Sequence, residues 1–368
     1  MRSERVTIRE VAFDVMDDAY ARASGSQRLP VKPRQIMYVA RPEILERTGN
    51  ASLDDAYFTQ SLLIDYMEEY DCSSWDIIWD ARGHFLEPHT GREVALGTLE
   101  VRQYLGPRPS FDPPKTSLTF PTAGPENRYR NILFVEKEGF HPILQAARLQ
   151  DRFDIGLMST KGMSVTAARM LIDALTDLGV ERFFVLNDLD ISGFSIRGTL
   201  GTDSRRYVYR NKPSIIDIGL RLDDVLQMSL QSEPIPYEHD AMWRKRAATL
   251  RRHGAAPDEI DFLRRSRVEL NAMTSPQLIA FIETKLSEHG VKKLIPDDKI
   301  IAQQARRVIK ERLTQEALAK IADELSKQTQ TTPLPKNLRK LVEHFFERHP
   351  ELPWDAAILL ILNPPEKE

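Results

Sequence analysis

Three acidic residues, Glu136, Asp188 and Asp190, follow closely on two apolar segments of the sequence. Glu136 comes after Asn131-Ile-Leu-Phe-Val, and the two aspartates come after Arg182-Phe-Phe-Val-Leu-Asn. Short apolar segments rich in β-branched and aromatic residues are typical of buried strands in a parallel sheet. The carboxyl ends of parallel strands meet at one edge of the sheet, which is where ligands bind. We therefore expect these three carboxylates to lie close together.

Carboxylates in such proximity repel one another unless a cation lies between them. Oxygen donors suit Mg²⁺, which keeps several water molecules and leaves room for a phosphate group; Mn²⁺ is the alternative ion. If the backbone is extended, Asp190 points to the same side as Asp188. Gly193 then lets the chain turn into a helix, for which Ser192 is the expected N-cap. The pattern predicts a divalent-metal site that handles phosphate.

Composition narrows the class of protein. The chain has 368 residues, 41% of them hydrophobic, and a single cysteine, Cys72. This length predicts two or three domains, and one cysteine excludes a disulfide framework and a cysteine-based zinc site. The N-terminus lacks the apolar core of a signal peptide and no apolar stretch is long enough to span a membrane, so we expect a cytoplasmic protein without membrane contact.

The net charge of −3 gives no general attraction to nucleic acid, but basic residues cluster in the C-terminal half. The clusters are Arg244-Lys245-Arg246, Arg251-Arg252, Arg264-Arg265 with Arg267, and Arg306-Arg307 with Lys310 and Arg312. Clustered Lys and Arg neutralise phosphates, although acidic residues interleaved with several clusters are equally typical of solvated helix faces.

The elements that must position these residues fall into an α/β and α+β arrangement. Residues 1–105 are expected to form an N-terminal helix and a winged-helix DNA-binding domain. Helical spacing predicts helices at 5–23, at 34–41 ending before Pro42, and from Ser52 to Tyr70, followed by a hairpin between 75–80 and 84–88. A proline-rich linker covers 106–128, a parallel α/β domain covers 129–225, and a basic helical region follows at 226–368.

The acidic pattern Glu…Asp-x-Asp-x-x-Gly resembles the Toprim domain of topoisomerases, primases and some nucleases. A Toprim domain preceded by a winged helix is similar to the A subunit of topoisomerase VI and to the related meiotic double-strand-break protein. Further matching stretches are Arg34-Gln-Ile-Met-Tyr38, Thr160-Lys161-Gly162, Ile216 to Asp224 and Arg267 to Ala272. The chain departs from the family pattern at Met37, Thr160, Ile191 and Leu222. These departures are typical of a divergent bacterial member.

The resemblance implies that Tyr38 attacks DNA and forms a 5′-phosphotyrosyl bond, with Mg²⁺ held by Glu136, Asp188 and Asp190. A phenol with a pKa of about 10 needs a cation or base to become a nucleophile. Arg34 lies one helical turn before Tyr38 and could supply that charge. The alternative is an ordinary core tyrosine on an amphipathic helix.

The resemblance also implies double-stranded DNA as the substrate, association with the nucleoid, a homodimer and a GHKL-type ATPase B subunit. The sequence has no P-loop motif, so the ATPase would be a separate chain. The leading hypothesis is the DNA-cleaving A-type subunit of a type IIB topoisomerase-like complex. Alternatives are a hydrolytic Toprim nuclease, as used in plasmid or phage defence, and a non-catalytic DNA-binding subunit. Three residues are candidates for assisting roles: Glu138, Lys161 and Arg221.

Overall fold

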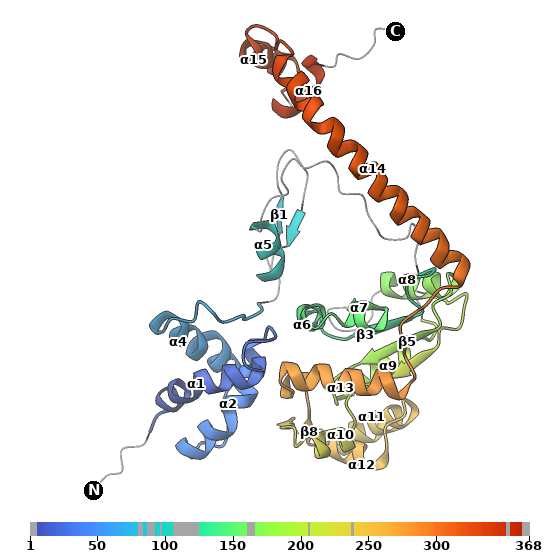
Figure 1. The fold of residues 1–368 in the computed structure, drawn as a ribbon. Coiled ribbons are helices and arrows are strands. Elements are labelled where there is room, and N and C mark those ends of the chain that lie inside the picture. Colours follow the sequence, from blue (N-terminus) through green and yellow to red (C-terminus); the bar gives the residue numbers. More distant parts are fainter. Residues whose placement is uncertain are drawn as a thin grey trace. The chain divides into compact units, whose positions relative to one another are not determined.

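The computed structural model describes residues 6–79, 84–86, 93–95, 98–105, 125–159, 166–204, 207–236, 239–350 and 354–362 (Figure 1). The chain divides into two compact units. The larger contains residues 1–83, 95–106 and 121–295, and the smaller contains 84–94, 107–120 and 296–368. All the candidate site residues belong to the larger unit.

The predicted parallel sheet is confirmed. Its four strands are β3 (Asn131–Val135), β4 (Ile155–Ser159), β5 (Arg182–Leu186) and β6 (Ile215–Asp217), in the order β4-β3-β5-β6. All neighbouring strands run parallel, and Val135 at the end of β3 pairs with Leu186 at the end of β5. This register places the residues that follow β3 and β5 at the same edge of the sheet.

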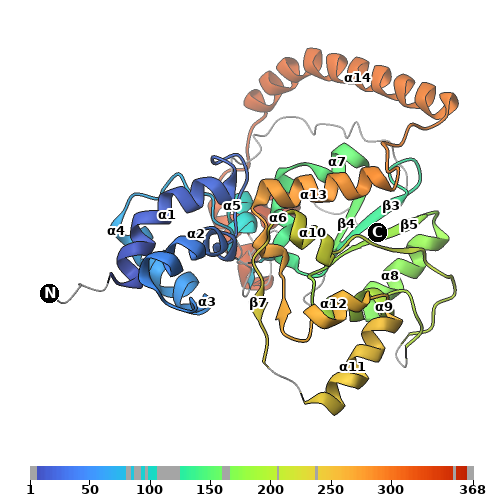
Figure 2. The same ribbon diagram turned by 90° about the horizontal axis from the view of Figure 1, so that it is seen from below.

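Both faces of the sheet are buried, which explains why its strands are continuously apolar. Leu133, Val135, Phe184 and Leu186 pack with α6 (His141–Ala146), α7 (Leu149–Phe153) and α13 (Ser275–Glu288). The alternate residues Ile132, Phe134, Phe183 and Val185 pack with α8 (Thr166–Asp177) and α9 (Ile191–Thr199). Figure 2 shows α7 and α13 on one side of the sheet and α8 and α9 on the other.

The N-terminal helices form their own apolar core. They are α1 (Ile8–Ser24), α2 (Pro33–Thr48), α3 (Asp55–Tyr57), the π-helix Phe58–Leu62 and α4 (Leu63–Glu69). The third predicted helix begins at Asp55 rather than at Ser52, and the side chain of its N-cap, Asp54, accepts from the Tyr57 N–H.

Helix α2 does not end before Pro42 as the sequence predicts, but continues to Thr48. A proline inside a helix cannot donate to the carbonyl four residues earlier, here that of Tyr38. The Gln231 side-chain amide donates to this carbonyl oxygen at 2.5 Å. A residue distant in sequence therefore satisfies the group that Pro42 leaves unpaired.

The predicted hairpin pairs the wrong segments of the chain. The two-stranded sheet consists of β1 (His84–Leu86) and β2 (Glu93–Ala95), followed by α5 (Thr98–Leu105). Within the described residues 75–79, only Ile77 forms a bridge, with Val31. The winged-helix assignment stays a prediction, and most of the proposed linker, 106–124, lies outside the described residues.

The region after residue 221 is mainly helical, with α10 (Leu222–Gln227), α11 (Asp240–Arg252), α12 (Pro257–Phe262) and α13. It also contains a feature that the sequence did not predict, an antiparallel pair of β7 (Glu233–Pro234) and β8 (Ser266–Arg267). This pair, followed by the 3-10 helix Leu270–Ala272, brings Glu233, Arg267 and Glu269 to helix α2.

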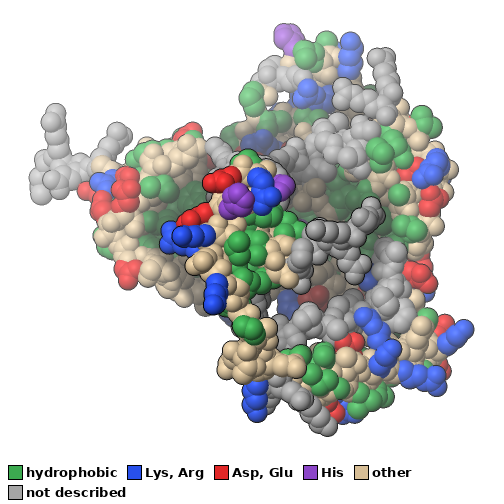
Figure 3. All heavy atoms as spheres, turned by 90° about the horizontal axis from the view of Figure 1, so that it is seen from above, with side chains coloured by type: hydrophobic (Ala, Val, Ile, Leu, Met, Phe, Trp, Pro, Cys, Tyr) green, Lys and Arg blue, Asp and Glu red, His purple; other side chains and the backbone are tan. Residues whose placement is uncertain are grey.

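The smaller unit contains the 34-residue helix α14 (Asp298–Thr331), then α15 (Leu338–Arg348) packed on α16 (Trp354–Leu362). Helix α14 ends at Thr331, two residues before Pro333. On the molecular face drawn in Figure 3, Lys and Arg side chains lie among Asp and Glu side chains. The described residues of that face carry no continuous basic surface.

Candidate functional site

Glu136 and Asp188 lie buried at the carboxyl edge of the sheet, as the strand order requires. The Glu136 N–H donates to the Leu186 carbonyl oxygen at 3.2 Å, which extends the pairing of β3 and β5 by one step. Glu136 is 7% exposed and Asp188 is 2% exposed. Asp190 begins α9, where its Oδ1 accepts from the Gly193 N–H at 2.6 Å. Asp190, and not Ser192, is therefore the N-cap.

The electrostatics of this edge favour a bound cation. Burial and the negative charges of Asp188 and Asp190 raise the pKa of Glu136 to about 7. Burial raises the pKa of Asp190 to about 6, although the Gly193 N–H opposes this. Within the described part of the chain, Glu136 Oε2 is buried without a hydrogen-bond partner. A buried polar atom without a partner is costly, and a cation would satisfy it.

Asp188 differs from the other two acids because the protein occupies both of its oxygens. Its Oδ1 accepts from the Leu270 N–H at 2.8 Å, and its Oδ2 lies 2.5 Å from Nζ of Lys137. Among the described residues, no three Asp, Glu, His or Cys side chains are placed so as to hold a metal ion by themselves. Mg²⁺ needs only one or two carboxylates when water and phosphate complete its shell, so Glu136 and Asp190 fit that ion.

Lys137 and Glu269 also belong to the site. The sequence patterns assign a role to neither, although Glu269 lies in the matching stretch from Arg267 to Ala272. Lys137 Nζ lies 3.3 Å from Glu269 Oε2 as well as beside Asp188. Although burial opposes it, Asp188 and Glu269 raise the pKa of Lys137, so its ammonium group stays charged. The position of Lys137 directly after Glu136 is the signal that could have found it.

Tyr38 is buried and its hydroxyl donates to Glu233 Oε1 at 2.5 Å. Burial, this hydrogen bond and the charge of Glu269 raise the pKa of Tyr38 far above its ordinary value. Arg34 acts in the opposite direction, as the sequence suggests, but burial outweighs it. In this arrangement the phenol keeps its proton.

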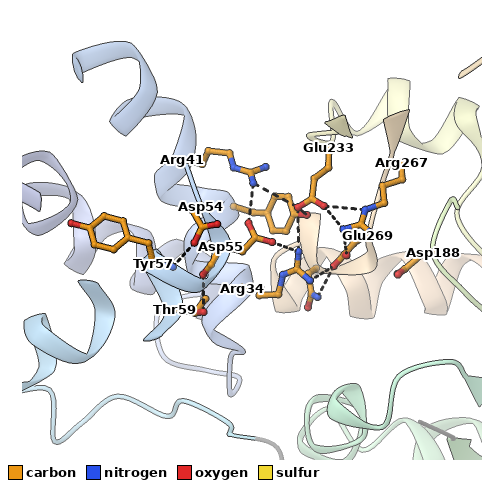
Figure 4. Close-up of polar contacts among 12 residues, drawn as sticks. Arg34, Arg41, Asp54, Asp55, Tyr57, Thr59, Asp188, Glu233, Arg267 and Glu269 are labelled. Carbon is orange, nitrogen blue, oxygen red and sulfur yellow. Dashed lines mark hydrogen bonds and ion pairs between the residues drawn. The ribbon is translucent and has the colours of Figure 1, made fainter. Parts of the chain in front are cut away.

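Arg34 is engaged by three acids rather than by the phenol (Figure 4). It contacts Asp55, Glu233 Oε1 at 3.2 Å and Glu269 Oε2 at 2.9 Å. Arg267 donates to Glu233 Oε2 at 2.8 Å and lies 3.4 Å from Glu269. Burial acts to raise the pKa of Glu233, but Tyr38, Arg267 and Arg34 together lower it.

A continuous series of polar contacts thus joins the tyrosine to the acidic edge. In order, the series runs through Tyr38, Glu233, Arg34, Glu269, Lys137 and Asp188. We call these residues, with Arg267, the central network. Beside it, a pocket of about 580 Å³ is lined by Asp190, Ser192, Arg246 and Arg267 together with apolar residues.

The candidate assisting residues have other positions. Arg221 pairs with Glu259 at 2.6 Å and with Asp217 at 3.1 Å rather than with the acids of the carboxyl edge. Its partners come from α12 and β6, which the sequence alone could not bring together. Lys161 and the side chain of Glu138 lie outside the described residues.

Two glycines hold the backbone of the aspartate loop in place. A methyl group at Gly219 would overlap the side-chain amide of Asn187, and one at Gly193 would overlap the Asp188 carbonyl oxygen. Asn187 is itself buried. Close packing against these two glycines therefore holds Asn187, the residue before Asp188, in position.

Gly219→Ala is expected to lower the free energy of unfolding by about 1–3 kcal/mol and to reduce DNA cleavage, because Asn187 must move. Urea denaturation and a plasmid-cleavage assay measure the two effects. Gly49→Ala is the control: its φ of 68° disfavours alanine through the backbone alone, because a methyl group there would meet no atom within 4 Å. Its cleavage should therefore be unchanged, and an equal loss of cleavage in the two variants would contradict the proposed constraint.

Comparisons with known proteins agree with this geometry. Residues 131–289 match the family model of the Toprim domain of the topoisomerase 6 A subunit and Spo11. The match includes the central network from Lys137 to Glu269 and extends beyond 225, the predicted end of the α/β domain. No curated protein matches the chain significantly. None of the helices in the described residues is long and apolar enough to cross a membrane. Residues 131–289 are a Toprim domain of the kind found in Spo11 and the topoisomerase 6 A subunit.

Proposed function

We propose that this chain is the DNA-cleaving subunit of a type IIB topoisomerase-like complex, with Tyr38 as the nucleophile. The observation that carries the proposal is the central network, which connects the Tyr38 hydroxyl to Asp188 within one chain. A tyrosine that merely filled the N-terminal core would need one acceptor for its hydroxyl, but not a series of contacts that reaches the acidic edge.

In the proposed reaction, the Tyr38 oxygen forms a bond to a DNA phosphorus while the bond from that phosphorus to the 3′ oxygen breaks. The products are a 5′-phosphotyrosyl linkage and a 3′ hydroxyl, and the phenol gives up its proton. Glu136 and Asp190 would hold Mg²⁺ with Asp188 alongside. A bound Mg²⁺ supplies charge neutralisation for the phosphate and the leaving oxygen.

Tyr38 must become accessible before it can react. It is 1% exposed, and Glu233 holds its hydroxyl. The proposal therefore requires DNA to loosen the contacts of α2 with Glu233 and Glu269. Arg34 and Arg267, released from these acids, would then be available to phosphate oxygens, which guanidinium groups bind well.

The partners follow from the same proposal. The exposed side chains of Arg244, Lys245 and Arg246 on α11 extend from the pocket beside Asp190 and suit the backbone of double-stranded DNA. Cutting both strands requires two such sites, which a two-fold homodimer supplies. Strand passage would require ATP hydrolysis by a separate GHKL-type B subunit.

The burial of Tyr38 favours a second candidate, a metal-dependent Toprim nuclease in which water attacks the phosphate. In that case the phenol is structural, and its raised pKa has no catalytic consequence. Glu136 and Asp190 keep the same metal-holding role. The products would be free 5′ phosphates without attached protein.

Tyr38→Phe distinguishes the two candidates. The full-length protein, with and without an ATPase partner, is incubated with supercoiled plasmid and Mg²⁺ and then stopped with SDS. Transesterification predicts protein attached to 5′ DNA ends, and loss of both adduct and cutting in Tyr38→Phe. The control, Tyr57→Phe, changes an exposed tyrosine and should behave as the unmodified chain does.

Cut plasmid with free ends, unchanged in Tyr38→Phe, would establish the nuclease instead. DNA binding without any cutting, unaffected by Asp188→Ala, would indicate a non-catalytic DNA-binding subunit.

A further inference from the structure

Lys137 holds a position at the acidic edge that a cation would otherwise take. Its Nζ lies 2.5 Å from Asp188 Oδ2 and 3.3 Å from Glu269 Oε2. The two acids are 2% and 4% exposed, so their charges need a partner inside the protein. We propose that the ammonium group of Lys137 replaces one divalent cation, so that the edge binds a single metal ion through Glu136 and Asp190.

The donor atoms divide the edge into two halves. On one side, both oxygens of Asp188 are engaged by Lys137 and by the Leu270 N–H. On the other side, Glu136 Oε2 is buried and has no hydrogen-bond partner in the described part of the chain. Asp190 uses Oδ1 to cap α9, and its side chain lines the pocket of about 580 Å³. The open donors are thus on the side of Glu136 and Asp190.

The balance of charges also favours a single divalent ion. Four carboxylates, Glu136, Asp188, Asp190 and Glu269, surround one ammonium group. Lys137 pairs with Asp188, and Arg34 and Arg267 pair with Glu269, so the charges left to balance are those of Glu136 and Asp190. One divalent ion beside Lys137 would balance the remaining acids, whereas two would have to displace the ammonium from Asp188.

A different role for Lys137 would be direct contact with a DNA phosphate. Its ammonium group already has two buried carboxylate partners, and a phosphate oxygen would compete with both of them. The contacts therefore favour Lys137 as a fixed positive charge that positions Asp188. It is a positioning residue and touches no reacting atom.

The inference rests on the metal-binding part of the proposed function. Its test therefore measures metal binding in the absence of DNA and does not depend on cleavage. Mn²⁺ is titrated into the metal-free, full-length protein, with free Mn²⁺ followed by electron paramagnetic resonance. The unmodified chain is expected to bind one Mn²⁺. Lys137→Met removes a repelling charge and releases Asp188, so it should bind Mn²⁺ about tenfold more tightly or better.

The double variant Lys137→Met/Asp188→Asn is the matched control. It removes both members of the ion pair, and its affinity should return to within about threefold of the unmodified chain, because Asp188 carries the gain. Thermal unfolding supplies a second readout that does not require a stable metal-free variant. Mn²⁺ should raise the melting temperature of Lys137→Met more than that of the unmodified chain.

Three results would overturn the inference. They are two Mn²⁺ ions bound to the unmodified chain, weaker or unchanged binding in Lys137→Met, and increased affinity that persists in the double variant. If no Mn²⁺ binds the unmodified chain and Glu136→Gln has no effect, the metal-binding part of the proposed function itself fails. The two failures are therefore distinguishable.

Discussion

Glu136→Gln is expected to abolish DNA cleavage while making the metal-free protein more stable. Glutamine keeps the shape of the side chain but lacks the charge that binds a cation, so cleavage should fall about 100-fold or more. The same change removes a buried carboxylate whose pKa is raised to about 7 by burial, Asp188 and Asp190. The free energy of unfolding should rise by about 1–2 kcal/mol at neutral pH without metal.

Plasmid cleavage and urea denaturation of the metal-free protein measure these opposite effects. Glu181→Gln is the matched control. Glu181 is an exposed acid just before β5, at the opposite edge of the sheet, where it pairs with Arg130 at 3.2 Å. It should change neither quantity appreciably. Retained cleavage in Glu136→Gln would remove Glu136 from the metal site, and a loss of stability would show that its carboxylate is structural.

Glu233→Ala is expected to cause the largest loss of stability, about 3 kcal/mol in the free energy of unfolding. Glu233 receives hydrogen bonds from Tyr38, Arg34 and Arg267, and it is 7% exposed. Alanine leaves a buried hydroxyl and two guanidinium groups with fewer partners. Removing one member of a buried ionic group costs more than removing a surface charge.

Chemical denaturation measures the effect, with two comparison variants. Glu233→Gln keeps an acceptor for Tyr38 but loses the charge, so its cost should be smaller than that of alanine. Glu288→Ala removes an exposed acid at the end of α13 and should stay within about 0.5 kcal/mol. A Glu233→Ala protein as stable as Glu288→Ala would mean that the central network contributes little to folding.

The sheet and its acidic edge can be predicted because the relevant signals are local. The continuously apolar segments 131–135 and 182–186 indicate strands that are buried on both faces. Once the strands are parallel, Glu136 and Asp188 must lie at the same edge. Helix α8 and its end before Gly179, which has a positive φ of 96°, follow from periodicity and from the conformational freedom of glycine.

The central network cannot be predicted in the same way because its signals are not local. Glu233 is part of no motif, and its partners Tyr38 and Arg34 lie about 200 positions earlier. Similarly, the predicted end of α2 is wrong because Gln231 satisfies the carbonyl that Pro42 leaves unpaired. The sequence places Arg221 near the metal edge, but its actual partner, Glu259, comes from a distant helix.

The same long separations affect how the chain folds during synthesis. The N-terminal helices leave the ribosome first. Their contacts include Tyr38 with Glu233, Gln35 with the Met273 carbonyl, and Ser275 with the Pro30 carbonyl, across 195, 238 and 245 positions. Until residue 275 has been made, Tyr38, Gln35 and the Pro30 carbonyl lack one or more of these partners. Contacts between residues so far apart in the sequence form slowly. The larger unit can therefore close only after residue 275 has been synthesised.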